Sequence, residues 1–108
     1  MNFSNVDILR EFWISFNLAY NKEDFQNVLI QSKINCMELL ESLEGDEYST
    51  ISNESPLFAI ISEVHRVCPE AVEELAATDP FFELALSLFS TYSEEKRNLL
   101  RDTFLKNN

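Results

Sequence analysis

The 108-residue sequence contains few residues of the kind that form tight turns, with one glycine and three prolines. Two-residue hairpin turns usually require glycine, so this shortage disfavours an all-β fold. Phosphate-binding loops also depend on several glycines, and a chain with one glycine cannot form such a loop. The missing turn residues therefore favour a helical fold.

Groups that bind metals or act as nucleophiles are scarce too. His65 is the single histidine, and neither an HExxH motif nor a CxxC pair occurs. The segment that begins at Asp46 does not fit an EF-hand calcium loop, since Ile51 and Leu57 occupy the positions of its glycine and its last glutamate. We expect no metal, no cofactor and no enzymatic activity; an enzyme would need His65 to face a cleft with two carboxylates.

Long hydrophobic runs are also lacking. The longest charge-free runs, residues 12–21 and 84–93, span ten residues each, whereas a membrane helix needs about 20 apolar residues. The first eleven residues do not have the pattern of a secretory signal, because charged residues interrupt them. We therefore expect a cytoplasmic protein that does not enter a membrane. In a reducing compartment Cys36 and Cys68 are expected to be small buried apolar residues, with a redox pair as the alternative.

Apolar residues are plentiful, at 45% of the chain, and nine of them are phenylalanines. This is enough for one hydrophobic core, so we expect a single helical domain over residues 1–108. The predicted fold is all-α, with about six helices in an irregular orthogonal or bundle-like arrangement. The residues expected to cap or open these helices are Ser4, Asn21, Ser55-Pro56, Pro69, Asp79-Pro80 and Ser93.

Apolar spacing predicts which faces of these helices are buried. In the first helix the apolar face consists of Leu9, Phe12, Trp13, Phe16 and Tyr20. In the second, predicted over residues 22–44 and stopped by Gly45, it consists of Phe25, Leu29, Ser32, Cys36, Leu39 and Leu43. In the third it consists of Leu57, Ile60, Ile61, Val64 and Cys68. Residues 80–90 are apolar nearly all round, which predicts that this helix is central.

The net charge of −11 is concentrated in one part of the chain. Residues 34–95 contain fourteen acidic residues and one base, Arg66, and carry −13, whereas the remainder carries +2. Such a surface repels nucleic acid and anionic membranes and suits a basic protein partner. The alternative is that the acidity only keeps the protein soluble.

The acids near the end of the second helix are the hardest to explain by local stability. Acids in first turns are stabilised by the helix dipole, but Glu38, Glu41 and Glu44 lie in the last two turns, where the dipole disfavours them by about 0.3–1 kcal/mol each. Asp46 and Glu47 follow directly and add like-charge repulsion. Because these carboxylates destabilise the end of the helix, their presence predicts that they have a function.

A second strip on the same helix is apolar. Ile30, Ile34 and Met37 are expected to point away from the buried seam, and Ile14 and Leu18 do the same on the first helix. Apolar anchors rimmed by charge are typical of binding surfaces. The alternative is that other helices of the domain cover them.

These patterns lead to two functional hypotheses. The first is an acidic protein that neutralises a basic partner, such as an immunity protein that blocks a bacterial toxin nuclease of the colicin or contact-dependent kind, or a phage inhibitor of a host nuclease. The second is a helical adaptor or oligomerisation module that uses the apolar strip of the second helix. The oligomeric state stays open.

Overall fold

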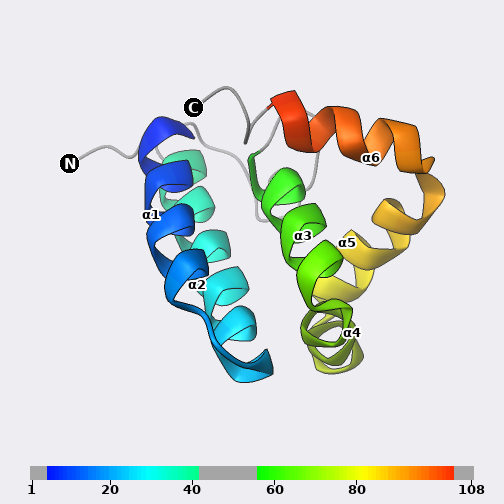
Figure 1. Cartoon of the computed structure of the whole chain (residues 1–108), viewed down its shortest axis with the longest axis horizontal. Coiled ribbons are helices and arrows are strands. Elements are labelled where there is room, and N and C mark those ends of the chain that lie inside the picture. Colours follow the sequence, from blue (N-terminus) through cyan, green and yellow to red (C-terminus); the bar gives the residue numbers. More distant parts are fainter. Residues whose placement is uncertain (1–4, 42–55, 104–108) are drawn as a thin grey trace.

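The computed structural model describes residues 5–41 and 56–103, with only the backbone for residue 5 and residues 39–41. In these two stretches the regular structure is helical, as the sequence predicts, and consists of α1 (Asn5–Leu18), α2 (Lys22–Glu41), α3 (Pro56–Val67), α4 (Pro69–Thr78), α5 (Pro80–Thr91) and α6 (Glu94–Arg101) (Figure 1). Helices α1 and α2 form a pair on one side of α3, α5 and α6 lie on the other side, and α4 lies below α3, where it also contacts α2 (Figure 1). None of the helices described is both long and apolar enough to cross a membrane.

Side-chain caps start three of the helices where the sequence predicts them. The Asn21 side chain accepts a hydrogen bond from the Asp24 N–H at 2.9 Å, which satisfies one of the free donors in the first turn of α2. The Asp79 carboxylate accepts from the Phe81 N–H at 2.9 Å at the start of α5. Ser93 caps α6 in the same way, at 3.1 Å. The predicted caps Ser4 and Ser55, and the stop at Gly45, lie outside the described residues.

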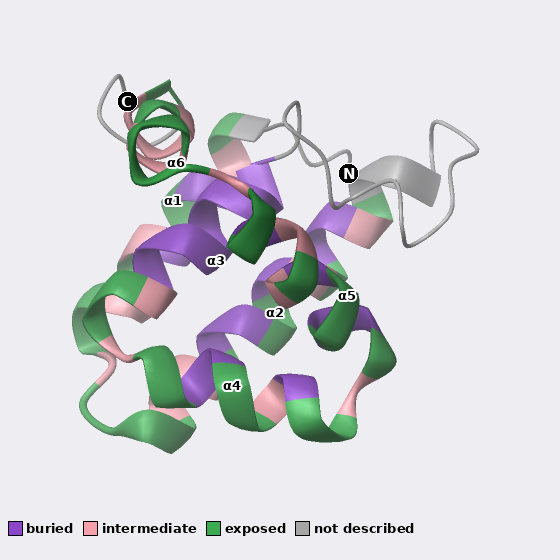
Figure 2. Cartoon of the chain, turned by 90° about the vertical axis from the view of Figure 1, so that its right-hand side faces the viewer, coloured by how far each residue is buried: buried purple, intermediate pink, exposed green. Residues whose placement is uncertain are grey.

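The central helix of the described fold is α3. Every residue from Pro56 to Val64 is buried, and α3 contacts each of the other five helices (Figure 2). The sequence placed the central helix at residues 80–90, now α5. That helix does bury Phe82 and other residues of one face, but Leu84 is exposed. The physical reason is position: α5 packs mainly against α4, so its outer apolar residues reach the surface.

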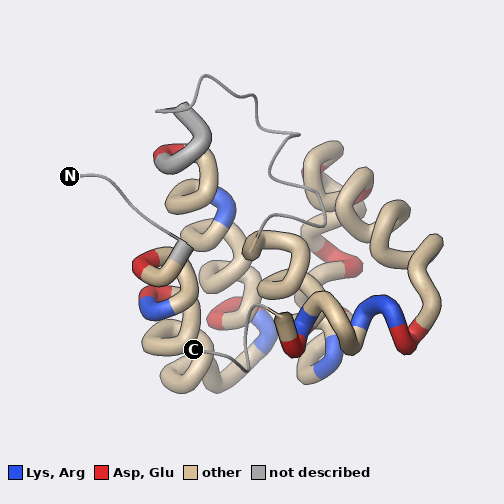
Figure 3. Tube along the Cα trace, turned by 90° about the horizontal axis from the view of Figure 1, so that it is seen from above, with Lys and Arg blue, Asp and Glu red and all other residues tan. Residues whose placement is uncertain are grey.

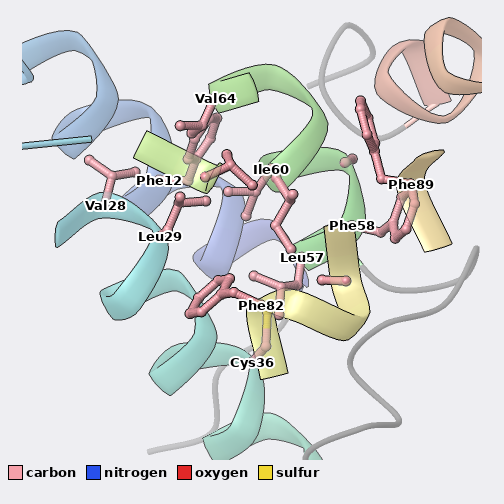
Figure 4. Packing of buried hydrophobic residues seen from close by; sticks show 14 of the residues in the cluster. Phe12, Val28, Leu29, Cys36, Leu57, Phe58, Ile60, Val64, Phe82 and Phe89 are labelled. Atoms are coloured by element: carbon pink, nitrogen blue, oxygen red, sulfur yellow. The ribbon is translucent and has the colours of Figure 1, made fainter. Parts of the chain in front are cut away.

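The hydrophobic core gathers side chains from both sides of α3. Phe12 of α1, Leu29 of α2 and Phe82 of α5 meet Ile60 and neighbouring side chains of α3 (Figure 4). Each of these side chains is at most 1% exposed. Complete burial of a side chain of this size contributes about 1.5–3 kcal/mol, so the core fixes how the helices are placed relative to one another.

Two residues expected on buried faces lie elsewhere. Tyr20 is almost fully exposed, because α1 ends at Leu18 and helical spacing no longer applies to the turn that follows. Cys68 does not extend the buried face of α3; it lies at the junction before α4 and is half-buried against the core. Cys36 is buried, as predicted.

Candidate functional site

The outward side of α2 carries exposed apolar residues. Ile30 is 40% exposed and Ile34 is 44% exposed, while Met37 is half-buried beside them. Residues four apart lie one above the other on a helix, so Ile30, Ile34 and Glu38 form one row. We call these four residues, Ile30, Ile34, Met37 and Glu38, the α2 outer face. The alternative that other helices cover Ile30 and Ile34 does not apply to the described structure.

The charge of the α2 outer face has no compensation within the described residues. Glu38 is exposed and makes no ion pair with any of them. The bases of α1 and α2 are engaged elsewhere: Arg10 pairs with Asp7 at 3.3 Å. Lys22 pairs with Glu74 of α4 at 2.8 Å. The ammonium of Lys33 lies 4.1 Å from the ring centre of Phe81 of α5. The negative charge of Glu38 is therefore left uncompensated within the described part of the chain.

Most of the predicted acidic cluster lies beyond the part of the chain with described side chains. Glu41 is the last residue of α2, and only its backbone is described. Glu44, Asp46 and Glu47 lie outside the described residues. The grouping of these four carboxylates with Glu38 stays a prediction of the sequence.

The outward side of α1 also carries exposed apolar residues. Ile14 is exposed, and Leu18 is 77% exposed. Leu18 also lines a shallow groove of about 370 Å³ between α1 and α2, together with Asn27 and Gln31 of α2 and with the buried Val28. The groove thus places polar amides of α2 beside an exposed leucine of α1.

Polar contacts fix the inner edge of α2 against its neighbours. The Gln26 amide donates to the Ala71 carbonyl at 3.5 Å and to the Glu74 carboxylate at 3.3 Å, both on α4. Buried Asn35 accepts from Gln31 at 3.1 Å. The two contacts with α4 and the packing of Leu29 orient α2, so its outer face is held in place.

His65 is half-buried on α3, with its ring centre 4.8 Å from that of Phe89. Burial lowers its pKa; Glu73 opposes this shift and Arg97 adds to it. His65 lines a pocket in which Glu94 is the one carboxylate among the lining residues, so the pair of carboxylates that an enzyme would need is not found there. Among the described residues no three potential metal-ligating side chains lie together.

Sequence reasoning missed a basic cluster on the far side of α3 from the α1–α2 pair. The same pocket brings Arg66 of α3 together with Arg97 and Arg101 of α6. In the sequence, Arg66 is conspicuous only as the single base among the acids of residues 34–95. The available signal was the spacing of Arg97 and Arg101, which are one helical turn apart and so lie on one side of α6.

Comparison of the chain with models of known protein families gave no match, and searches of curated proteins and of solved structures gave none either.

Proposed function

We propose that this protein binds and neutralises a basic protein partner through the α2 outer face. The observation that carries the proposal is the exposure of Ile30 and Ile34 next to a carboxylate, Glu38, that no described base neutralises. Apolar anchors supply most of the binding energy at protein interfaces, while surrounding charges select the partner and accelerate its arrival. The combination suits a partner with a cationic rim around an apolar patch.

A nuclease is the kind of basic partner that fits best. Its substrate-binding cleft carries cations that neutralise phosphates, and an array of carboxylates on a helix can occupy that cleft in place of the nucleic acid. The proposed role is that of a cytoplasmic immunity protein against a bacterial toxin nuclease, or of a phage inhibitor of a host nuclease. The net charge of −11 supports this choice and disfavours nucleic acid or an anionic membrane as the direct partner.

A second candidate function is a helical adaptor or oligomerisation module. It is favoured by the exposure of Leu18 on α1 in addition to Ile30 and Ile34 on α2, which together offer an apolar surface to a second helix. The two functions respond differently to salt: capture of a basic partner should weaken sharply as salt screens the charges, whereas an apolar interface should persist.

The test reverses two charges of α2, one of them Glu38 in the apolar row and the other in the first turn, and compares them with reversals on other helices. Glu23→Lys and Glu38→Lys together change two exposed acids of α2. The matched control is Glu73→Lys with Glu83→Lys, which makes the same charge change at exposed positions of α4 and α5. Circular dichroism checks that all proteins remain helical.

Each protein is immobilised and exposed to a native cell extract, and bound proteins are eluted with a salt gradient. A basic protein retained by the wild type and by the control, but not by the α2 variant, is then purified, and its affinity is measured by surface plasmon resonance. We expect the α2 variant to bind about tenfold or more weakly, mainly through slower association. Equal affinity of the α2 variant and the control would remove the acidic α2 face from the proposal.

Ile34→Ser separates the two candidate functions. Loss of partner binding together with an unchanged, monomeric sedimentation profile of the protein alone supports the neutralising role. A salt-resistant dimer of the wild type that Ile34→Ser dissociates would instead favour the oligomerisation module.

A further inference from the structure

A pocket of about 410 Å³ lies between α3, α5 and α6. We call it the α3–α6 pocket. Its walls include three arginines, which stand out in a chain with more than twice as many acids as bases. The lining residues are Ser62, His65, Arg66, Phe89, Glu94, Arg97, Asn98 and Arg101.

Two of the arginines are held in place by one buried carboxylate. The Glu63 side chain is 9% exposed and pairs with Arg66 of its own helix and with Arg101 of α6. A guanidinium has five N–H donors. Arg66 directs its Nε and one Nη toward Glu63, and Arg101 directs its Nε toward Glu63 and one Nη toward the Asn98 side chain. Both arginines therefore keep further Nη donors while their positions are fixed.

The third arginine is fixed without a carboxylate. The Arg97 Nε donates to the Tyr92 carbonyl at 3.0 Å, and its guanidinium lies 4.5 Å from the ring centre of Phe89. Arg97 makes no ion pair with any described acid. The two Nη groups of Arg97 therefore pair with no carboxylate of the described residues.

The charge of the cluster is positive although the chain is strongly negative. Three arginines and Glu63 together carry +2, and exposed Glu94 lowers this to +1. His65 adds no charge near neutral pH, because burial lowers its pKa. The two carboxylates of the cluster, Glu63 and Glu94, require only two of the three guanidiniums for neutralisation. The additional positive charge is left to be matched by something outside the chain.

We propose that the α3–α6 pocket binds a dianionic phosphate group of a small molecule or of inorganic phosphate. Guanidinium groups fixed in a fork geometry are the donors that best match the oxygens of phosphate. With Glu94 counted the pocket carries +1, so it favours an anion, and a phosphate group offers more acceptor oxygens to the three arginines than a single carboxylate does. The pocket lies on α3 and α6, away from the α2 outer face, so this site is separate from the proposed partner-binding surface.

The experiment titrates the full chain with sodium phosphate at pH 7.5 in 150 mM NaCl, where long-range repulsion from the acidic surface is screened beyond about 8 Å. The arginine Nε–Hε signals are followed by NMR. We expect saturable shifts of the signals of Arg66, Arg97 and Arg101 and no such shifts when NaCl is added to the same ionic strength. Phenyl phosphate distinguishes the sources: tighter binding than inorganic phosphate indicates a phosphate carried by an organic molecule, and equal binding indicates phosphate itself.

The matched variants are Arg97→Gln and Lys96→Gln. Both remove one charge from α6, but Lys96 is exposed and stacks on Tyr92 outside the pocket lining. Arg97→Gln should weaken phosphate binding about tenfold, which corresponds to the loss of one charge-assisted hydrogen bond, and Lys96→Gln should change it little. Thermal unfolding shows whether each variant is folded.

Three results would overturn the proposal: no saturable shift in the wild-type protein, the same affinity in the two variants, or acetate binding as tightly as phosphate. The first of these needs no variant, so the test stands even if Arg97→Gln does not fold. Partner capture through α2 is measured separately and does not depend on any of these outcomes.

Discussion

Replacing Glu63 with glutamine should destabilise the fold by about 2 kcal/mol, because a buried carboxylate that links two helices is lost. The Glu63 side chain is 9% exposed and lies on the central helix α3. Its Oε1 pairs with Arg66 on α3, and its Oε2 lies 3.6 Å from the Nε of Arg101 on α6. The α6 helix has no buried residue of its own, so this ion pair is one of the few fixed contacts by which it docks.

The two partners contribute unequally to this free energy. The Arg66 side chain is 56% exposed, so water solvates it after the exchange, and exposed ion pairs contribute only about 0–1 kcal/mol. The Arg101 side chain is 20% exposed, and leaving donors without a charged acceptor there costs about 1–3 kcal/mol. Burial therefore matters more than distance. Arg101, although it lies farther from Glu63, is expected to account for most of the lost stability.

The measurement is urea unfolding followed by circular dichroism at 25 °C. The control is Glu11→Gln, which changes the charge equally at an exposed position of α1 that has no ion pair with a described residue. This control should change the free energy of unfolding by less than about 0.5 kcal/mol. If Glu63→Gln and Glu11→Gln have the same effect, the α3–α6 link does not stabilise the fold and the reasoning is refuted.

Three further predictions concern single side chains. Stability should decrease as pH falls below about 6.5, because burial lowers the pKa of His65 in the folded chain, so the unfolded chain takes up the proton first. The loss of stability ends once the pH is below the lowered pKa. Thermal unfolding between pH 5 and 8 should show this loss in the wild type but not in His65→Gln, and the same pH dependence in both would contradict the prediction. Burial raises the pKa of the Cys36 thiol to about 12, so little reactive thiolate is present at pH 8. In a Cys68→Ser background, Cys36 should therefore react with a disulfide reagent at pH 8 only after the protein unfolds. Rapid labelling of the native protein would disprove this. Asp79→Ala should cost about 1 kcal/mol through loss of the α5 cap. Urea unfolding measures this loss of stability, with Thr78→Ala as the control at an exposed position. An equal loss of stability in the two variants would argue against a role for the cap.

The helix starts could be predicted from the sequence because their causes are local. Asn21, Asp79 and Ser93 cap the helices that follow them through hydrogen bonds within three residues. Pro69 and Pro80 stand at first helical positions, where the missing N–H has no partner to lose. Hydrogen bonds of such short range depend on neighbouring residues in the sequence and not on the tertiary fold.

The position of the central helix could not be predicted in the same way. The segment 80–90 contains three phenylalanines and α3 contains one, yet α3 is the one that all other helices contact. Ala59 and Ser62 of α3 are small, and both are buried. Small side chains allow neighbouring helices to approach closely, and apolar composition alone does not reveal which helix is approached from all sides.

The candidate site was predictable to the same limited extent. Helical spacing placed Ile30 and Ile34 opposite the buried seam of α2, and both are exposed. Spacing within α6 could also have placed Arg97 and Arg101 on one side. Helical spacing could not predict that Arg66 lies near these two arginines, because their proximity depends on how α6 packs across α3.

The separation of the two surfaces bears on how a basic partner would approach. The α2 outer face carries uncompensated negative charge, and the bases of α6 lie on the other side of α3 (Figure 3). The arginines of the α3–α6 pocket repel a cationic surface, whereas Glu38 attracts one, so the two faces would differ in how they meet the partner proposed above. A uniformly acidic surface would attract such a partner equally from all sides. If the protein binds a basic partner through α2 as proposed, the arginine cluster would disfavour approach from the α6 side, and an anion bound between α3 and α6 would weaken this effect without changing any contact at α2.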